Sequence, residues 1–159
     1  EVVFMDGGST MIEVAAAIDP DLDLTVVTHS PPVAEVLAGK PGVEIVLIGG
    51  RLLKETMTTT GAEAVDAVRG VRAALCLTSP CGLDADAGIT AMRAEEAPVK
   101  RAMIEGARRT VAVATADKLG TAAPFVVAPA HRLAALVTDA SDGAAVAALS
   151  RLGVRMVTP

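Results

Sequence analysis

Apolar runs recur along the chain with helical patterns between them, and this alternation predicts an α/β fold. The runs are rich in Val, Ile, Leu and Ala and lack polar alternation, which is typical of parallel strands buried on both faces. They predict strands at residues 2–5, 24–28, 43–48, 73–78, 110–115, 133–138 and 154–157. The intervening patterns predict helices at residues 10–18, 31–38, 61–69, 95–107 and 142–152. We therefore expect a mostly parallel central sheet with helices on both faces.

Boundary residues refine two of these helices. Pro31 and Pro32 are expected in the first turn of their helix, where a missing N–H costs little. Ser141 or Asp142 is expected to cap the last helix, and Gly153 to end it. The longest segment without clear periodicity runs from residue 49 to residue 61.

Composition supports this architecture and bounds the domain count. The 159 residues suit one domain, and 52% of them are hydrophobic. Only two residues, Phe4 and Phe125, are aromatic, so the core must consist of Ala, Val, Leu and Ile. Such a core suits strands that alternate with Ala-rich helices better than it suits an all-β sandwich.

The charge balance argues against nucleic-acid binding by this chain itself. Fourteen basic and 19 acidic residues give a net charge of −5, and no block of Lys or Arg is present. Affinity for nucleic acids depends mostly on basic contacts to phosphate, and single-strand binders add aromatic platforms. The sequence offers neither.

Neither a metal, a cofactor nor a membrane is expected as a partner. Cys76 and Cys81 with two His are too few for a structural zinc site or a disulfide framework, and Cys76 is expected on a buried strand. No apolar run reaches the roughly 20 residues that span a bilayer, and no signal peptide is recognisable. We therefore expect a cytoplasmic location.

The segment Asp6–Thr10 is the first candidate for binding chemistry. It follows a strand pattern and precedes a helical one, so it predicts a tight glycine turn at a helix N-terminus. Free backbone N–H groups and the helix dipole attract anions there, and Ser9 and Thr10 add hydroxyl donors. The segment therefore predicts a phosphate or carboxylate site. The alternative is an ordinary strand-to-helix turn with a cap.

Three more polar or glycine-rich motifs follow predicted strands, where parallel sheets form their ligand crevice. In residues 28–30, Thr28 and His29 are candidates for a polar ligand, while Ser30 is also a candidate helix cap. Gly49 and Gly50 permit close approach of a ligand to the backbone, or form a simple turn. The third motif is residues 79–82.

Charged residues later in the chain give no catalytic constellation. Glu96 and Lys100 are spaced i, i+4, which is typical of a surface ion pair. Lys118 follows a predicted strand and is a candidate phosphate contact or part of a solvated turn. The residue pattern indicates anion binding without evident chemistry.

Taken in order, these motifs resemble the C-terminal effector-sensing domain of DeoR-type bacterial transcription regulators. The resemblance covers nearly the whole chain, and the order and spacing of the motifs make it specific. The matching segments are Asp6-Gly7-Gly8-Ser9-Thr10, Thr28-His29-Ser30, Ile48-Gly49-Gly50-Arg51-Leu52, Gly61, Gly82-Leu83-Asp84, Gly88-Ile89-Thr90, Glu96-Ala97-Pro98-Val99-Lys100-Arg101-Ala102-Met103-Ile104, Ala116-Asp117-Lys118-Leu119-Gly120 and Thr138-Asp139.

The resemblance implies a fold like ribose-5-phosphate isomerase and a domain that binds a phosphorylated sugar or related metabolite. Residues 1–159 would form the sensor domain. The chain begins at Glu1 inside a strand pattern without an initiator Met, so we expect it to be truncated at the N-terminus. The family's DNA-binding winged helix-turn-helix would precede it, and DNA would be a partner only through that part. The resemblance also implies a homodimer or homotetramer.

Two departures from the family pattern bear on ligand preference. His29 replaces the usual Asn, which exchanges an amide for an imidazole. Pro80 and Cys81 stand where relatives often have a small or acidic residue. Related isomerases use acidic residues near this region for proton transfer, and Cys81 cannot be assumed to replace them.

Two hypotheses follow. In the first, a non-catalytic sensor binds phosphate on the N–H groups of residues 8–10, with charge from Lys100 and Lys118; an alternative for Lys100 is a pair with Glu96. The ligand-binding residues would be Asp6, Gly7, Gly8, Ser9, Thr10, Thr28, His29, Ser30, Gly49, Gly50, Gly82, Lys100 and Lys118. In the second, the same fold is a sugar-phosphate isomerase whose carboxylate base is Glu96 or Asp84.

Overall fold

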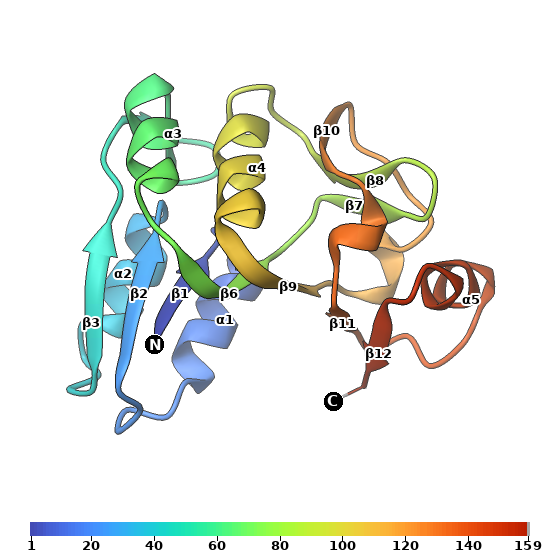
Figure 1. Cartoon of the computed structure of the whole chain (residues 1–159), viewed down its shortest axis with the longest axis horizontal. Coiled ribbons are helices and arrows are strands. Elements are labelled where there is room, and N and C mark those ends of the chain that lie inside the picture. Colours follow the sequence, from blue (N-terminus) through green and yellow to red (C-terminus); the bar gives the residue numbers. More distant parts are fainter. Residues whose placement is uncertain (159) are drawn as a thin grey trace.

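A seven-stranded parallel sheet forms the centre of the molecule in the computed structural model, which describes residues 1–158 (Figure 1). All seven predicted strands are confirmed, and every neighbouring pair is parallel. The strand order is β12-β11-β9-β6-β1-β2-β3. The bounds are β1 Val2–Met5, β2 Leu24–Thr28, β3 Val43–Leu47, β6 Ala73–Thr78, β9 Ala107–Val113, β11 Ala135–Val137 and β12 Arg155–Val157.

Helices cover both faces of this sheet, as the sequence predicts. One face packs against α1 (Ser9–Ala17) and α2 (Pro31–Leu37), and the other against α3 (Ala62–Arg69) and α4 (Glu96–Gly106) (Figure 1). Helix α5 (Ala144–Arg151) lies beside β12 at the far edge. Alternate side chains of one strand point to opposite faces. Phe4 accordingly belongs to the core beneath α3 and α4, and Met5 to the core beneath α1 and α2.

Helix α4 is enclosed on most sides, and this placement explains its composition. A small antiparallel sheet packs against it, formed by β7 (Gly82–Asp84), β8 (Gly88–Ala91) and β10 (Phe125–Ala128) in the order β10-β8-β7. Small residues such as Ala97 and Ala102 let neighbours approach closely. The same enclosure buries two charged side chains, Glu96 and Lys100.

The segment without clear periodicity contains a hairpin rather than a plain loop. Strands β4 (Arg51–Leu53) and β5 (Thr58–Thr60) pair antiparallel. The hairpin is anchored to the main sheet because the amide of Thr59 donates to the carbonyl of His29 at 2.7 Å. All three β5 residues are threonines with buried side chains, so the strand lacks the apolar alternation that predicts one from sequence.

Several predicted boundaries differ from the structure. Pro31 and Pro32 do occupy the first turn of α2, but neither Ser141 nor Asp142 caps α5. Gly143 takes that cap position with φ 113°, a conformation that glycine adopts without strain. Strand β9 starts at Ala107, directly after α4 and ahead of the predicted position. Among the helices formed by residues 1–158, none is long and apolar enough to cross a bilayer.

Candidate functional site

The register of the parallel strands brings two polar residues together at the carboxyl end of the sheet. Strand β1 pairs with β2 and β6, so that Met5 lies opposite Thr28 and Leu77. Asp6 and His29 follow directly after their strands and therefore meet beyond this end. The chain order reverses between β1 and β6, and ligands in open α/β sheets bind at such a switch point.

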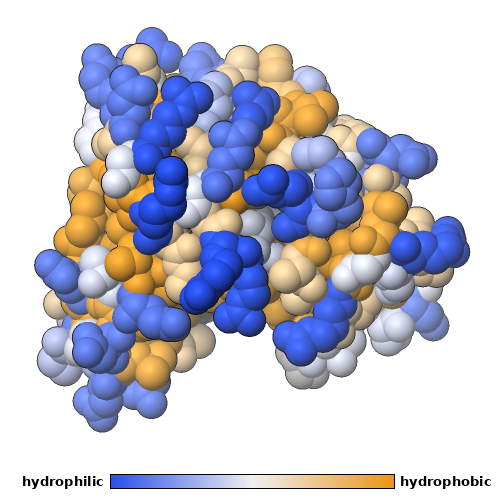
Figure 2. Space-filling view, in the orientation of Figure 1, coloured by the Kyte–Doolittle hydropathy of each residue, from blue (hydrophilic) through white to orange (hydrophobic). Residues whose placement is uncertain are grey.

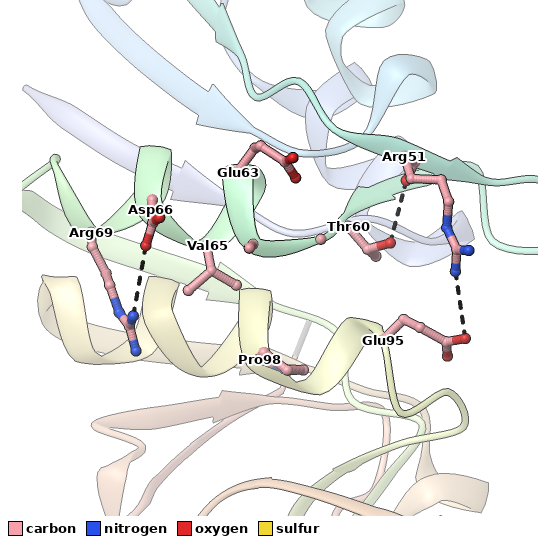
Figure 3. A pocket seen from close by; sticks show the side chains of 10 residues that line it. Arg51, Thr60, Glu63, Val65, Asp66, Arg69, Glu95 and Pro98 are labelled. Carbon is pink, nitrogen blue, oxygen red and sulfur yellow. Dashed lines mark hydrogen bonds and ion pairs between the residues drawn. The ribbon is translucent and has the colours of Figure 1, made fainter.

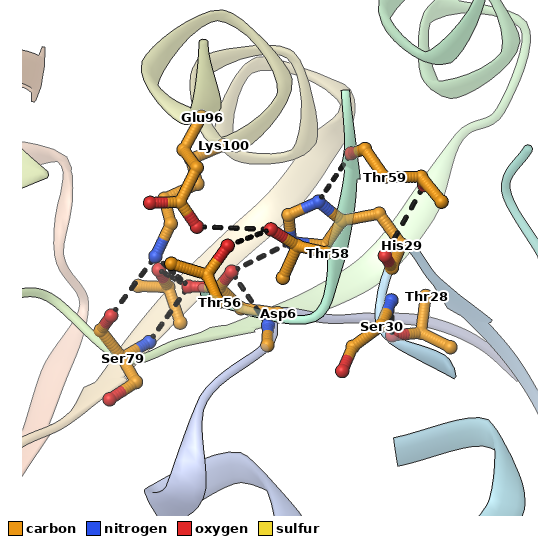
Figure 4. A network of polar contacts seen from close by, with 12 residues as sticks. Asp6, Thr28, His29, Ser30, Thr56, Thr58, Thr59, Ser79, Glu96 and Lys100 are labelled. Carbon is orange, nitrogen blue, oxygen red and sulfur yellow. Dashed lines mark hydrogen bonds and ion pairs between the residues drawn. The ribbon is translucent and has the colours of Figure 1, made fainter. Parts of the chain in front are cut away.

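The buried carboxylate of Asp6 is the centre of the polar network in Figure 4. Its Oδ2 accepts a hydrogen bond from Lys100 Nζ at 2.8 Å, and its Oδ1 lies 3.0 Å from His29 Nε2. Neutral groups complete its coordination: the amide of Gly7 at 2.8 Å, the hydroxyl of Thr78 at 2.8 Å and the amide of Ser79 at 3.0 Å. Both oxygens of the Asp6 carboxylate are therefore engaged by hydrogen bonds, and these bonds hold the surrounding loops in place.

Electrostatics keep this pair ionised despite its burial. Burial alone would raise the pKa of Asp6, but the charge of Lys100 and the contact with His29 outweigh it and hold that pKa well below its usual range. Burial likewise opposes charge on Lys100, yet the Asp6 carboxylate raises the pKa of Lys100 above its usual value. A second acceptor, the carbonyl of Ser79, lies 3.2 Å from Nζ.

The imidazole of His29 contacts the other oxygen of Asp6. Its Nδ1 faces the carbonyl of Thr59 at 3.1 Å, and its Nε2 faces the Asp6 carboxylate. Both ring nitrogens thus lie against an oxygen acceptor. The ring and the ammonium of Lys100 together fix the Asp6 carboxylate beneath the loop of residues 6–10.

A cavity of about 290 Å³ opens directly above this network. One wall is the start of α1, where the first helical bond runs from Ile12 N to Gly8 O and leaves the preceding amides free of helical acceptors. Lys118 contributes a further positive charge. The residues that line the cavity are Gly7, Gly8, Ser9, Glu55, Thr56, Ser79, Pro80, Cys81, Glu96, Lys100 and Lys118.

Glu96 and Lys100 do not form the surface ion pair that their spacing suggested. They are 4% and 5% exposed, and Lys100 pairs with Asp6 instead. Glu96 accepts a hydrogen bond from the hydroxyl of Thr58 at 3.1 Å through Oε1. The tertiary partners lie far away in sequence, so spacing along the helix could not reveal them.

The structure brings some predicted site residues to the cavity and places others beneath it. Gly7, Gly8, Ser9, Lys100 and Lys118 line it, whereas Asp6 and His29 lie buried in the network below. Thr10, Thr28, Ser30, Gly49, Gly50 and Gly82 are not among the lining residues. A role for that last group in ligand binding stays a prediction.

Structural contacts are evident for three of the predicted site residues: Thr28, Gly7 and Gly82. The hydroxyl of Thr28 accepts from the amide of Ser30 at 3.1 Å and shapes the turn into α2. A Cβ on Gly7 would lie 2.4 Å from Thr58 and 3.2 Å from Ser30, so the loop needs glycine there. Gly82 is equally confined, because a Cβ would meet the carbonyl of Thr121 at 2.8 Å.

Sequence reasoning did not include Glu55, Thr56 or Ser79 among the ligand-binding residues, and it treated Glu96 only as a helix pair or a possible base. Glu55 and Thr56 come from the unrecognised β4–β5 hairpin. Ser79 directly follows a predicted strand, and this position at a strand end was the feature of the sequence that could have marked it as a site residue. Of the two candidate bases, Glu96 lines the cavity, while Asp84 accepts the amides of residues 86 and 87.

A larger cavity of about 560 Å³ lies between α3 and α4 (Figure 3). Four of its five charged side chains form pairs, Arg51 with Glu95 at 3.7 Å and Arg69 with Asp66 at 3.8 Å, and the fifth, Glu63, is exposed. Exposed pairs of this kind contribute little, and no buried charge points into this space. Within residues 1–158, no cluster of His, Cys, Asp and Glu side chains suits a metal ion.

Comparison with known proteins identifies the family. The family described as the DeoR C terminal sensor domain matches residues 1–140. The HTH-type transcriptional repressor GlcR of Bacillus subtilis is 32% identical over 137 residues, which cover 86% of this chain and 52% of that protein. The HTH-type transcriptional regulator GlpR of Haloferax volcanii is 32% identical over 139 residues, which cover 87% of this chain and 54% of that protein.

The glycerol-3-phosphate regulon repressor of Escherichia coli is 29% identical over 138 residues, which cover 87% of this chain and 55% of that protein. The chain thus spans about half the length of these relatives. All are named as regulators or repressors, in agreement with a regulatory and non-enzymatic domain. The fold, the order of the motifs and the family match together show that this chain belongs to the DeoR family, as its C-terminal sensor domain.

Proposed function

We propose that this domain binds a phosphorylated sugar, or a related phosphorylated metabolite, in the cavity above Asp6. The observation that carries the proposal is the convergence of anion-binding groups on one small space. The start of α1, the ammonium of Lys118 and the ammonium of Lys100 all border it. Backbone N–H groups at a helix start and lysine side chains are the groups that proteins use for phosphate.

The charge below the cavity strengthens this proposal. The ammonium of Lys100, paired with Asp6 at 2.8 Å, places a buried positive charge at the wall of the cavity. The cluster is buried, where water screens charges weakly. Its hydrogen bonds also fix the loop of residues 6–10, and a fixed loop avoids an ordering cost when the ligand binds.

We further propose that ligand binding modulates DNA binding by another part of the regulator. Two of the relatives are named as HTH-type regulators, and a third is named as the repressor of the glycerol-3-phosphate regulon. A ligand shifts a conformational equilibrium only through different affinities for the two states. The cavity is suited to such a shift, because its walls come from the separate segments α1, the β4–β5 hairpin, α4 and the turn holding Lys118.

The double variant Ser9→Ala with Lys118→Ala tests this site. Both residues line the cavity without a role in the Asp6 network, so the fold should survive. Each loses a hydrogen bond to a charged group, and affinity for a sugar phosphate should fall at least about tenfold by calorimetry. Arg108→Ala, an exposed charge at the opposite end of β9, is the matched control. Unchanged affinity in the double variant would refute the assignment.

The isomerase alternative makes a different prediction. Glu96 is the carboxylate available in the cavity for a proton transfer between sugar carbons. A coupled assay for aldose–ketose interconversion would then show turnover that Glu96→Gln removes. A sensor binds the same sugar phosphates and shows no turnover above background.

A further inference from the structure

Glu96 presents a free carboxylate oxygen to the candidate ligand cavity. The side chain is 96% buried, since only 4% of it is exposed, and Oε1 accepts the hydroxyl of Thr58. None of the hydrogen bonds formed within residues 1–158 reaches Oε2. Buried polar side-chain atoms in this part of the chain all have partners, so Oε2 must keep contact with the open space of the cavity (Figure 4).

Hydrogen-bond direction makes the neighbouring hydroxyl an acceptor as well. Thr58 has one hydroxyl proton, and Glu96 takes it. In the contact of 2.8 Å between the hydroxyls of Thr56 and Thr58, Thr56 must therefore be the donor. The hydroxyl proton of Thr56 is then engaged, so this hydroxyl can only accept a hydrogen bond from a ligand. Thr56 and Glu55 line the cavity beside Glu96.

The cavity is consequently divided in chemical character. Gly8, Ser9 and Lys118 offer donors and positive charge on one side. Glu96 and Thr56 offer acceptors on the other, whereas Glu55 there already pairs with Arg93 at 3.8 Å. A phosphate satisfies the first side, and only a group with protons to donate satisfies the second.

We propose that Glu96 and Thr56 restrict the ligand to monophosphate esters with a free hydroxyl opposite the phosphate, and that they exclude bisphosphates. This inference rests on the proposed function. A hydroxyl donates to Oε2 of Glu96, whereas a second phosphate would meet a carboxylate of like charge, and the nearby ammonium of Lys100 already donates to Asp6 and to the carbonyl of Ser79. The volume of about 290 Å³ agrees, because it is at the lower end for ligand pockets and suits a small sugar phosphate.

Calorimetry with a matched set of probes tests this proposal. The probes are inorganic phosphate, fructose 1-phosphate, fructose 6-phosphate and fructose 1,6-bisphosphate, titrated into the wild-type domain, Glu96→Gln and Glu105→Gln. Glu105 is an exposed carboxylate on the same helix and serves as the control. Wild type should bind at least one monophosphate about tenfold more tightly than the bisphosphate.

In Glu96→Gln, the affinity for the monophosphate should fall about tenfold. The ratio of monophosphate affinity to bisphosphate affinity should also fall, because the Gln side chain adds a hydrogen-bond donor and removes the negative charge. Inorganic phosphate should bind both proteins equally, which also shows that the variant is folded. Equal wild-type affinity for bisphosphate, or monophosphate binding unaffected by Glu96→Gln, overturns the proposal. Binding of inorganic phosphate without any monophosphate overturns it too. If no phosphate compound binds at all, the proposed function fails with it.

Discussion

At the scale of single residues, Asp6 determines how the candidate site is held together. Its carboxylate joins Lys100, His29 and the ends of three strands, through contacts of 2.8 to 3.0 Å. A buried charge without its partner is costly, so each member depends on the others. The same residue therefore supports both the stability of the fold and the positive charge beneath the ligand.

Replacing Asp6 by Asn should destabilise the domain severely. The change leaves the ammonium of Lys100 and the ring of His29 buried without a countercharge. Losing one partner of a buried pair costs about 3–5 kcal/mol, and urea unfolding at pH 7 measures it. The control Asp66→Asn breaks an exposed pair and should change stability by less than about 1 kcal/mol. Equal effects of the two changes would contradict this role for Asp6.

The network also predicts how stability depends on pH. The pKa of Asp6 lies below its ordinary value of 3.8 in the folded protein, so its contribution is full above that value. The contribution is lost as the pH falls from about 4 toward the folded pKa. Lys100 behaves in the opposite sense, because its pKa is raised above 10.5 and its contribution is lost only above that pH. Urea unfolding at pH 7, 5 and 3 should show the advantage of wild type over Asp6→Asn shrinking only at pH 3.

The sequence pointed to polar residues at strand ends, but it could not show which partners from distant parts of the chain would meet them. Asp6, His29 and Lys118 follow strand patterns, and the sequence selected all three. Lys100 lies 94 residues beyond Asp6, and only the tertiary fold joins them. The i, i+4 spacing of Glu96 and Lys100 pointed to solvent, because a helix pattern alone cannot show that both of its sides are covered.

At the scale of elements, the β4–β5 hairpin is the part that supplies the acceptor side of the cavity. It enters through a turn at Gly50, which has φ 137°. A Cβ there would lie 2.5 Å from the carbonyl of Thr60, whereas a Cβ on Gly49 would meet nothing within 4 Å. Only the second of the two adjacent glycines is thus required by the backbone.

Gly50→Ala should therefore destabilise the domain by about 2 kcal/mol or more, through backbone strain and a clash within the hairpin. Gly49→Ala should change the free energy of unfolding by less than about 0.5 kcal/mol. Chemical denaturation of the two variants beside wild type measures the difference. Similar stability of both variants would show that the turn tolerates other conformations.

Short elements were the hardest to predict. Strands β4, β5 and β7 have three residues each, and β8 and β10 have four. Runs this short carry little periodicity, and β5 consists of Thr alone. The strands of the central sheet were predicted, including the three-residue β11 and β12, because each lies within a longer apolar run of the sequence. The missed strands hold Thr58 and flank Glu55 and Thr56, so missing them concealed one wall of the cavity.

At the scale of the whole molecule, the alternation of apolar runs was sufficient for the central sheet. Parallel strands with covered faces read as continuous apolar runs, and helices must then lie on both sides. The order of the strands does not follow from the pattern, since β1, the first strand in sequence, lies inside the sheet and its neighbours come from residues 24–28 and 73–78. That arrangement creates the switch point where the cavity lies.

The outer strand β3 leads to a prediction about assembly. It lies at the edge of the sheet, and Val46 and Leu47 on it are 41% and 48% exposed. Figure 2 shows hydrophobic surface among hydrophilic residues on the side of the molecule where β3 lies. An edge strand with exposed apolar side chains favours association. Light scattering coupled to size exclusion should report a homodimer or homotetramer, and a monomer at about 100 μM would contradict this expectation.

The central claim is that the cavity above Asp6 recognises a phosphate ester, and ligand-dependent thermal unfolding tests it most directly. The wild-type domain is heated with a panel of sugar phosphates, each paired with its unphosphorylated sugar. A ligand at 100 times its dissociation constant stabilises the folded state by about 2.7 kcal/mol, which gives a clear rise in Tm. The account predicts that at least one phosphorylated sugar raises Tm while its parent sugar does not. No rise with any member, or equal rises with both members of every pair, would contradict it.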